Sequence, residues 1–218
     1  MGTEIKCGII TWDEVYDACR KLVRLIEDSE YVPEILIGLA RSGFVPARLL
    51  SDFSGITNLY SLKVEHWLDT TAQHKEEAKI TSKLPIDVHG KKVLVIDDIA
   101  DTGKSMDLTF NYIKSFAPSE IKSAVVHYVT SSQHVPDYYA HKIEEWTWLI
   151  YPWNMIEDLA NLTVKLLKSS NNLTLEKIQM GLKEKFEIEV NLERIEEIVD
   201  VLQRRKKIAK RTDQIIAL

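Results

Sequence analysis

Apolar residues follow two patterns along the first 150 residues of the chain. Between Thr11 and about Ser29 they recur at spacings of three and four, which predicts a helix with one apolar face. Short, nearly unbroken apolar runs predict buried strands at 34–38, 58–64, 91–97, 123–130 and 147–151. Helices are predicted between them, at 45–50 and from 105 to 116. Strands that alternate with helices predict an α/β fold with a mainly parallel five-stranded sheet flanked by helices.

The last third of the chain has a helical pattern. Helices are predicted at 154–168, 173–185 and 192–205, separated by short polar stretches. We therefore divide the chain into a main domain at 1–164 and a small helical C-terminal appendage at 165–218. Residues 65–83 are polar and charged without a clear period, which predicts a mobile surface loop.

Length and charge narrow the range of functions. With 218 residues and 45% hydrophobic content, the chain can bury one substantial core. The net charge is −5 with both signs spread along the sequence, so we expect a small-molecule substrate rather than nucleic acid or a membrane as the main partner. The basic run Arg204–Lys207 ends a predicted helix and is assigned to the helix dipole, with a phosphate-contacting winged helix as the alternative.

The N-terminus and the cysteines favour the cytoplasm. Cys7 and Cys19 have neither metal-ligand spacing nor the dense pattern of a disulfide framework. The first twelve residues are too polar for an export signal, and no run reaches the roughly 18 apolar residues of a membrane span. We therefore expect a cytoplasmic protein with reduced thiols.

Three carboxylates and a turn follow the strongest predicted strand. Asp97 and Asp98 stand at its end, and Asp101 leads through the turn 102–105 into a helix. The N–H groups of such a turn and the positive end of the helix dipole can hold one phosphate, and Gly103 lets the backbone approach it closely. The carboxylates would repel that phosphate unless they face ribose hydroxyls or Mg²⁺. A phosphorylated sugar satisfies both halves of this arrangement.

Three segments resemble a known family. Val93–Ser105 resembles the signature of type I phosphoribosyltransferases, which join a base to the ribose of phosphoribosyl pyrophosphate (PRPP). Gly38–Pro46 is similar to the pyrophosphate loop of that family, and Trp146–Trp153 to the base-binding strand of its xanthine-guanine enzymes. The resemblance covers residues 1–160. It implies that 1–164 is the catalytic domain and that the protein forms a homodimer.

The resemblance also implies a role for each part of these segments. Asp97 and Asp98 would hold the ribose hydroxyls, and Asp101 would act as the catalytic residue, a proton acceptor or donor beside purine N7. The 5′-phosphate would lie on Ala100, Asp101, Thr102, Gly103, Lys104 and Ser105. Pyrophosphate would lie on Ala40, Arg41, Ser42 and Gly43, with the Arg41–Ser42 peptide cis. The base would lie on Ile99, Thr130, Trp148 and Leu149. Mg²⁺ would bind mainly through PRPP, with Asp97 and Asp98 as candidate protein ligands, and 65–83 would close over the sugar as a hood.

The identity of the base is inferred from a difference between this sequence and the 6-oxopurine enzymes of the family. At Thr130–Asp137 the 6-oxopurine enzymes usually carry a lysine that donates to the base O6, and this sequence has none there. Lysine only donates, so its loss favours the 6-amino group of adenine. An oxopurine-type core with a helical tail is also similar to an archaeal type of adenine phosphoribosyltransferase. We therefore predict purine salvage that makes AMP from adenine.

Two alternatives stay open. The first is a hypoxanthine, guanine or xanthine phosphoribosyltransferase, in which Lys142 or a water replaces the absent donor. The second belongs to another class, a PRPP-sensing regulator that binds DNA through residues 165–218. The third carboxylate, Asp101, argues against a degenerate sensing site.

Overall fold

The chain folds into two compact units in the computed structural model, which describes residues 6–68, 76–170, 172–211 and 214–217. The sheet unit is Trp12–Glu145, and the helical unit combines Met1–Thr11 with Trp146–Leu218. The first strand, β1 (Cys7–Ile9), belongs to the helical unit because it pairs in parallel with β8 (Trp148–Ile150). The chain thus divides after Glu145, earlier than the predicted boundary after 164. The assignment of catalysis to 1–164 stays a prediction.

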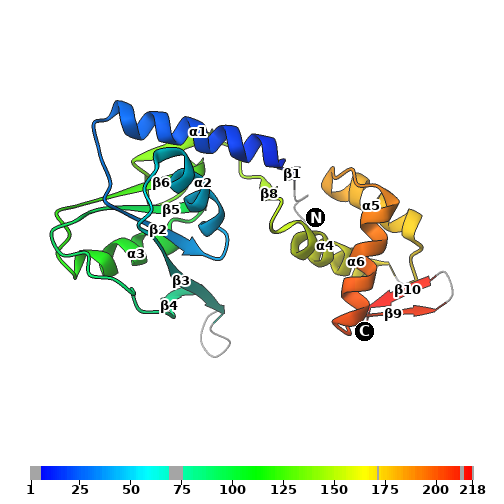
Figure 1. Cartoon of the computed structure of the whole chain (residues 1–218). Helices are drawn as coiled ribbons and strands as arrows, with labels where there is room; N and C mark the ends of the chain where they lie inside the picture. The colour runs from blue at the N-terminus through cyan, green and yellow to red at the C-terminus, as the bar shows by residue number, and fades with distance from the viewer. Residues whose placement is uncertain (1–5, 69–75, 171, 212–213, 218) are drawn as a thin grey trace. The chain divides into compact units, whose positions relative to one another are not determined.

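A mostly parallel sheet forms the centre of the sheet unit. Within the described residues it has six strands in the order β4-β3-β2-β5-β6-β7, and all neighbours are parallel except β3 and β4 (Figure 1). The strands are β2 (Ile35–Ala40), β3 (Leu59–Leu68), β4 (Glu76–Ile80), β5 (Lys92–Ala100), β6 (Glu120–Val129) and β7 (Tyr138–Ile143). The predicted α/β class with a mainly parallel sheet is confirmed.

The predicted number of five strands is wrong, since the sheet has six within the described residues, and two further details of it are wrong. The run at 147–151 is not a strand of this sheet, since Trp148–Ile150 pairs with β1, and Tyr138–Ile143 takes the edge position beside β6. The stretch 65–83 is not one irregular loop, because β3 continues to Leu68 and pairs with β4 from Val64↔Ile80 to Leu68↔Glu76. Residues 69–75 lie outside the described part, so a hood there stays a prediction.

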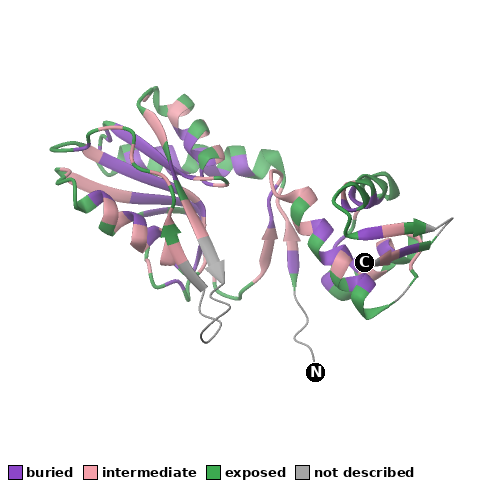
Figure 2. Cartoon of the chain, turned by 90° about the horizontal axis from the view of Figure 1, so that it is seen from below, coloured by how far each residue is buried: buried purple, intermediate pink, exposed green. Residues whose placement is uncertain are grey.

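Helices cover both faces of the sheet. The helices α1 (Trp12–Asp28) and α2 (Phe44–Ser54) pack on one face, and α3 (Lys104–Lys114) packs on the other (Figure 1). The apolar stripe predicted for α1 is its buried face, with Val15, Cys19 and Leu22 fully enclosed. Figure 2 shows the same burial along the central strands. Each such leucine or valine contributes about 1.5–3 kcal/mol when it leaves water, so this stripe holds α1 on the sheet.

The helical unit has its own apolar core. Its helices are α4 (Met155–Ser169), α5 (Leu175–Phe186) and α6 (Leu192–Arg204), close to the predicted positions. A hairpin that the sequence did not predict follows, formed by β9 (Ile208–Arg211) and β10 (Gln214–Ala217), and Leu173 adds an isolated bridge to Ile215. Three helices, a short bridge and a terminal hairpin give the element order of a winged helix. None of the helices in the described ranges is long and apolar enough to cross a membrane.

Candidate active site

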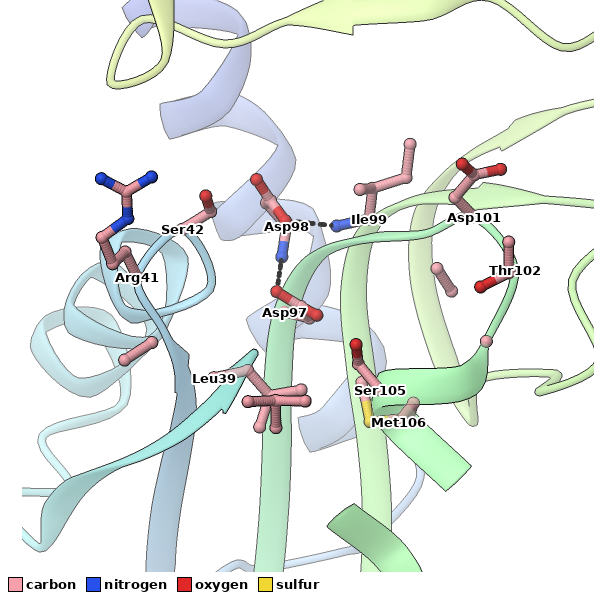
Figure 3. Close-up of a pocket in the computed structure, with 14 residues that line it drawn as sticks. Leu39, Arg41, Ser42, Asp97, Asp98, Ile99, Asp101, Thr102, Ser105 and Met106 are labelled. Atoms are coloured by element: carbon pink, nitrogen blue, oxygen red, sulfur yellow. Dashed lines mark hydrogen bonds between the residues drawn. The ribbon is translucent and has the colours of Figure 1, made fainter. Parts of the chain in front are cut away.

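Two loops meet at one edge of the sheet. Because β2 and β5 are adjacent parallel strands, the loop that begins at Ala40, the last residue of β2, lies beside the segment 97–105, which runs from the end of β5 into α3. Gly43 lies so close to β5 that a Cβ built on it would be 2.5 Å from Asp97 Oδ1 and 2.7 Å from both Asp97 Cα and Ile96 O. A glycine is therefore required here by space. The two loops line a cavity of about 420 Å³ (Figure 3).

The loop after β2 contains a cis peptide bond. It joins Ala40 to Arg41, one position before the Arg41–Ser42 bond that the resemblance implied. The prediction of a non-proline cis peptide in this loop is thus right, but its position is wrong by one residue. Arg41 and Ser42 both line the cavity, and Figure 3 shows them on the side opposite the turn at Thr102.

Asp97 and Asp98 occupy the end of β5. The Asp98 N–H donates to Asp97 Oδ1 at 2.9 Å, and the Ile99 N–H donates to Asp98 Oδ1 at the same distance (Figure 3). Asp98 is only 5% exposed. Burial and, after it, the charge of the neighbouring Asp98 carboxylate raise the pKa of Asp97 well above its ordinary value. Two adjacent carboxylates at this depth suit hydroxyl donors or a cation.

The turn after Asp101 leads directly into α3. Gly103 is its N-cap residue with φ of 82°, a left-handed conformation that favours glycine, and it provides no side-chain cap for the first N–H groups of α3. The backbone N–H groups at 102–105 and the positive end of the helix dipole have the chemistry to bind an anion. Thr102 and Ser105 line the same cavity and add hydroxyls.

Most of the predicted site residues are brought together by the fold. The cavity is lined by Leu39, Ala40, Arg41, Ser42, Val64, Asp97, Asp98, Ile99, Ala100, Asp101, Thr102, Gly103, Ser105 and Met106. Three of these, Leu39, Val64 and Met106, were not predicted, because nothing in the sequence distinguishes them from core residues. The predicted residues Gly43, Lys104 and Thr130 are not among these lining residues.

Two predicted base contacts lie in the helical unit. Trp148 and Leu149 belong to β8, where they pair with Cys7 and Gly8 of β1. Trp148 is partly buried against the core of that unit. Their assignment to the base stays a prediction, as does that of Thr130, whose N–H donates to Ile143 O at 2.9 Å within the sheet unit.

The chain is similar to known proteins over its first two thirds. The family model of the phosphoribosyl transferase domain matches residues 11–156. The xanthine-guanine phosphoribosyltransferase of Idiomarina loihiensis is 28% identical over 155 residues, which cover 69% of this chain and 91% of that protein. A purine phosphoribosyltransferase structure from Pyrococcus horikoshii Ot3 is 30% identical with a TM-score of 0.60, and the match covers 68% of this chain and 94% of that one. The chain therefore belongs to the phosphoribosyl transferase domain family.

Proposed function

We propose that this protein is a purine phosphoribosyltransferase, which transfers 5-phosphoribosyl from PRPP to a purine base and releases pyrophosphate. The observation that carries the proposal is the cavity where an acidic pair, a helix N-terminus and the Arg41 loop meet. PRPP has one group for each of them, namely ribose hydroxyls, a 5′-phosphate and a pyrophosphate. The names of the Idiomarina and Pyrococcus relatives support a purine as the acceptor.

Each part of the cavity has a task in this reaction. The bond from the anomeric carbon to pyrophosphate breaks, a bond to a ring nitrogen of the base forms, and the base gives up one proton. Positive charge develops on the ribose, so Asp97 and Asp98 stabilise it while they accept from the ribose hydroxyls. Asp101, at the mouth of the turn, takes the proton from the base, and Arg41 interacts with the departing pyrophosphate.

A magnesium ion fits this donor set only in part. Asp97 and Asp98 are hard oxygen ligands, but Mg²⁺ prefers six, and Asp97 Oδ1 and Asp98 Oδ1 each already accept a backbone N–H. Among the described residues, no group of three or more His, Cys, Asp or Glu side chains could hold a metal ion. We therefore propose that Mg²⁺ binds mainly through PRPP oxygens, where it would neutralise charge on the leaving group.

The relatives favour a 6-oxopurine over adenine as the base. Three similar proteins are named xanthine-guanine phosphoribosyltransferases, at 25–28% identity, and none of these names supports the predicted adenine specificity. The 6-oxopurine alternative is therefore the first candidate for the base. This candidate requires a side chain that donates to the base O6, and none of the residues lining the cavity is a lysine.

One observation keeps adenine as the second candidate. The segment Thr130–Asp137 has no lysine, and the alternative donor Lys142 lies on β7 with its Nζ 3.2 Å from Glu144 Oε1. Recruiting Lys142 for the base would break that ion pair. A site that lacks a required donor can discriminate between bases by several orders of magnitude, so this single position has a large effect.

The experiment is turnover of the purified protein with PRPP and Mg²⁺ against adenine, hypoxanthine, guanine and xanthine in parallel. It tests both the proposed reaction and the identity of the base. IMP, GMP or XMP formation supports the 6-oxopurine candidate, and AMP formation alone supports adenine. The variant Asp101→Asn should lose most turnover and keep its affinity for ribose 5-phosphate. The matched control Asp17→Asn, on the exposed face of α1, should leave both unchanged. Silence with all four bases would overturn the proposal.

A DNA-binding regulator is favoured by one observation and opposed by another. The winged-helix element order of the helical unit would present α6 to a DNA groove. The exposed acidic residues of α6, Glu193, Glu196, Glu197 and Asp200, repel phosphates and outnumber its exposed arginines, Arg194 and Arg204. We therefore expect no retardation of duplex DNA in a mobility assay at low salt. Salt-sensitive binding together with absent turnover would support the regulator instead.

A further inference from the structure

The segment after β6 returns onto the phosphate-binding turn. The Gln133 N–H donates to Thr102 O at 3.1 Å, and Gln133 Nε2 donates to Asp107 Oδ2 at 2.8 Å. Asp107 lies in the first turn of α3. One residue of this segment is therefore bonded both to the turn 102–105 and to the helix that begins there.

Close packing reinforces these bonds at the tip of the turn. A Cβ on Gly103 would lie 2.5 Å from His134 N, 2.6 Å from Ser132 Oγ and 2.9 Å from His134 Cβ. Gly103 is thus required twice, for its positive φ and for the approach of residues 132–134. Because no space separates the two segments, a displacement of either one displaces the other.

His134 ties the returning segment to two elements. Its Nδ1 is 2.8 Å from Asp107 Oδ1 on α3, and its Nε2 is 3.1 Å from Ser123 Oγ on β6. An ionised carboxylate only accepts, so the ring donates through Nδ1 in the first contact. The ring also packs edge-on against Phe110, with centroids 4.8 Å apart, and its side chain is only 10% exposed. The imidazole is therefore held from three directions.

The order Ser123, His134, Asp107 is also that of a hydrolytic triad, but its serine cannot serve as a nucleophile. Ser123 is fully buried, and its hydroxyl donates to Asp137 Oδ2 at 3.0 Å. The Asp137 N–H in turn donates to Ser123 Oγ at 3.1 Å. A nucleophile has to reach a substrate from a cleft. These contacts therefore anchor the segment on β6.

We propose that His134 and Gln133 are positioning residues for the 5′-phosphate site, acting through Asp107 and Gly103 on the turn 102–105. This inference rests on the proposed function, because it requires that the turn binds the phosphate of PRPP. Preorganised N–H groups bind an anion without the cost of ordering the turn. The contact between His134 and Asp107 is the main restraint, because the imidazole that makes it is nearly buried and held from three directions.

A set of variants separates this role from a purely structural one. His134→Ala removes both ring contacts. His134→Asn keeps a donor near the position of Nδ1 and so retains the bond to Asp107, whereas His134→Gln keeps a donor near Nε2 and loses it. Gln133→Ala removes the second, more exposed bond to Asp107. His89→Gln, at an exposed position of the loop before β5, is the matched control.

Calorimetric affinities for ribose 5-phosphate and for pyrophosphate are measured, with circular dichroism and thermal midpoints to follow folding. For His134→Ala we expect about tenfold weaker binding of ribose 5-phosphate, the equivalent of one charge-assisted hydrogen bond, and unchanged binding of pyrophosphate. His134→Asn should recover most of the loss, and His134→Gln should not. Equal loss of both ligands, or equal behaviour of the Asn and Gln variants, would overturn the positioning role.

The outcome for the proposed function is read separately. If the unmodified protein binds neither ribose 5-phosphate nor pyrophosphate, the proposed function fails and this inference fails with it. If the unmodified protein binds both and His134→Ala is indistinguishable from His89→Gln, only the inference is refuted.

Discussion

Replacing Gly43 with alanine tests how closely the two loops of the cavity are packed. Gly43 has φ of −65° and ψ of −15°, a conformation that alanine adopts without strain. In open space the substitution would stabilise the protein by about 0.4–1 kcal/mol, because alanine restricts the unfolded chain. The crowding around Gly43 has the opposite effect on stability. The added Cβ would meet Asp97 Cα and Ile96 O at 2.7 Å, and both are backbone atoms that cannot rotate away.

The loop would have to withdraw by most of an ångström to reach ordinary contact distance. Overpacking of this kind costs about 1–3 kcal/mol, so we expect Gly43→Ala to lower the urea midpoint and to raise the KM for PRPP. Gly55→Ala is the control, because Gly55 has φ of 71° and no atom within 4 Å of its added Cβ. It should cost about 1 kcal/mol through backbone strain alone and leave KM unchanged. A Gly43→Ala protein more stable than wild type, with unchanged KM, would refute the packing argument.

Individual side chains give three further predictions. Burial beside Asp98 raises the pKa of Asp97, so the native state holds the Asp97 proton more tightly, and stability is lost as the pH rises through the pKa of the native state. Asp97→Asn should therefore raise the urea midpoint at pH 7 while abolishing turnover, and a lower midpoint would contradict this. Burial, and after it the charge of His141, lowers the pKa of His127 to about 4, so the NMR titration of His127 should have its midpoint near that pH. The stability that neutral His127 contributes should be lost as the pH falls from about 6.5 toward 4, and His127→Gln should remove this pH dependence. Thr174 caps α5 by accepting a backbone N–H of its first turn, so Thr174→Ala should lower the stability of the helical unit by about 1 kcal/mol. Turnover should not change, and a loss of turnover in this variant would link that unit to the active site.

The strands that the sequence predicted correctly are those with a continuous apolar signal. β2 and the stretch Val93–Ile96 of β5 are buried on both faces, and all of their residues are apolar or glycine. At the edge of the sheet, β7 alternates buried and exposed residues in the polar sequence Tyr138–Ile143, and its pattern is short and weak. The run at 147–151 has the right composition but pairs with β1, a contact between distant parts of the chain that local periodicity does not encode.

The candidate site could be predicted as far as strand ends determine it. Parallel strands bring their carboxyl ends to one edge, and both 40–43 and 97–105 follow predicted strands, so their position at one edge follows from the predicted sheet. The returning segment at Gln133 and His134 could not be predicted in this way. Its contacts depend on the path of an irregular connection between β6 and β7, and a lone histidine in a polar stretch carries no signal of its partner Asp107.

The acidic pair was conspicuous in the sequence for a physical reason. Four buried apolar residues, Val93–Ile96, precede Asp97, and a strand selected for stability alone would continue with another apolar residue. Instead, two neighbouring carboxylates are placed where burial opposes their charge, and the raised pKa of Asp97 is the expression of that cost. The backbone N–H groups that donate to Asp97 and Asp98 offset part of that cost, and a ligand that supplies donors or positive charge offsets more of it. The same feature that lowers the stability of the free protein therefore favours binding of a ligand that brings hydroxyl donors or positive charge, and it marks the candidate site at the level of sequence.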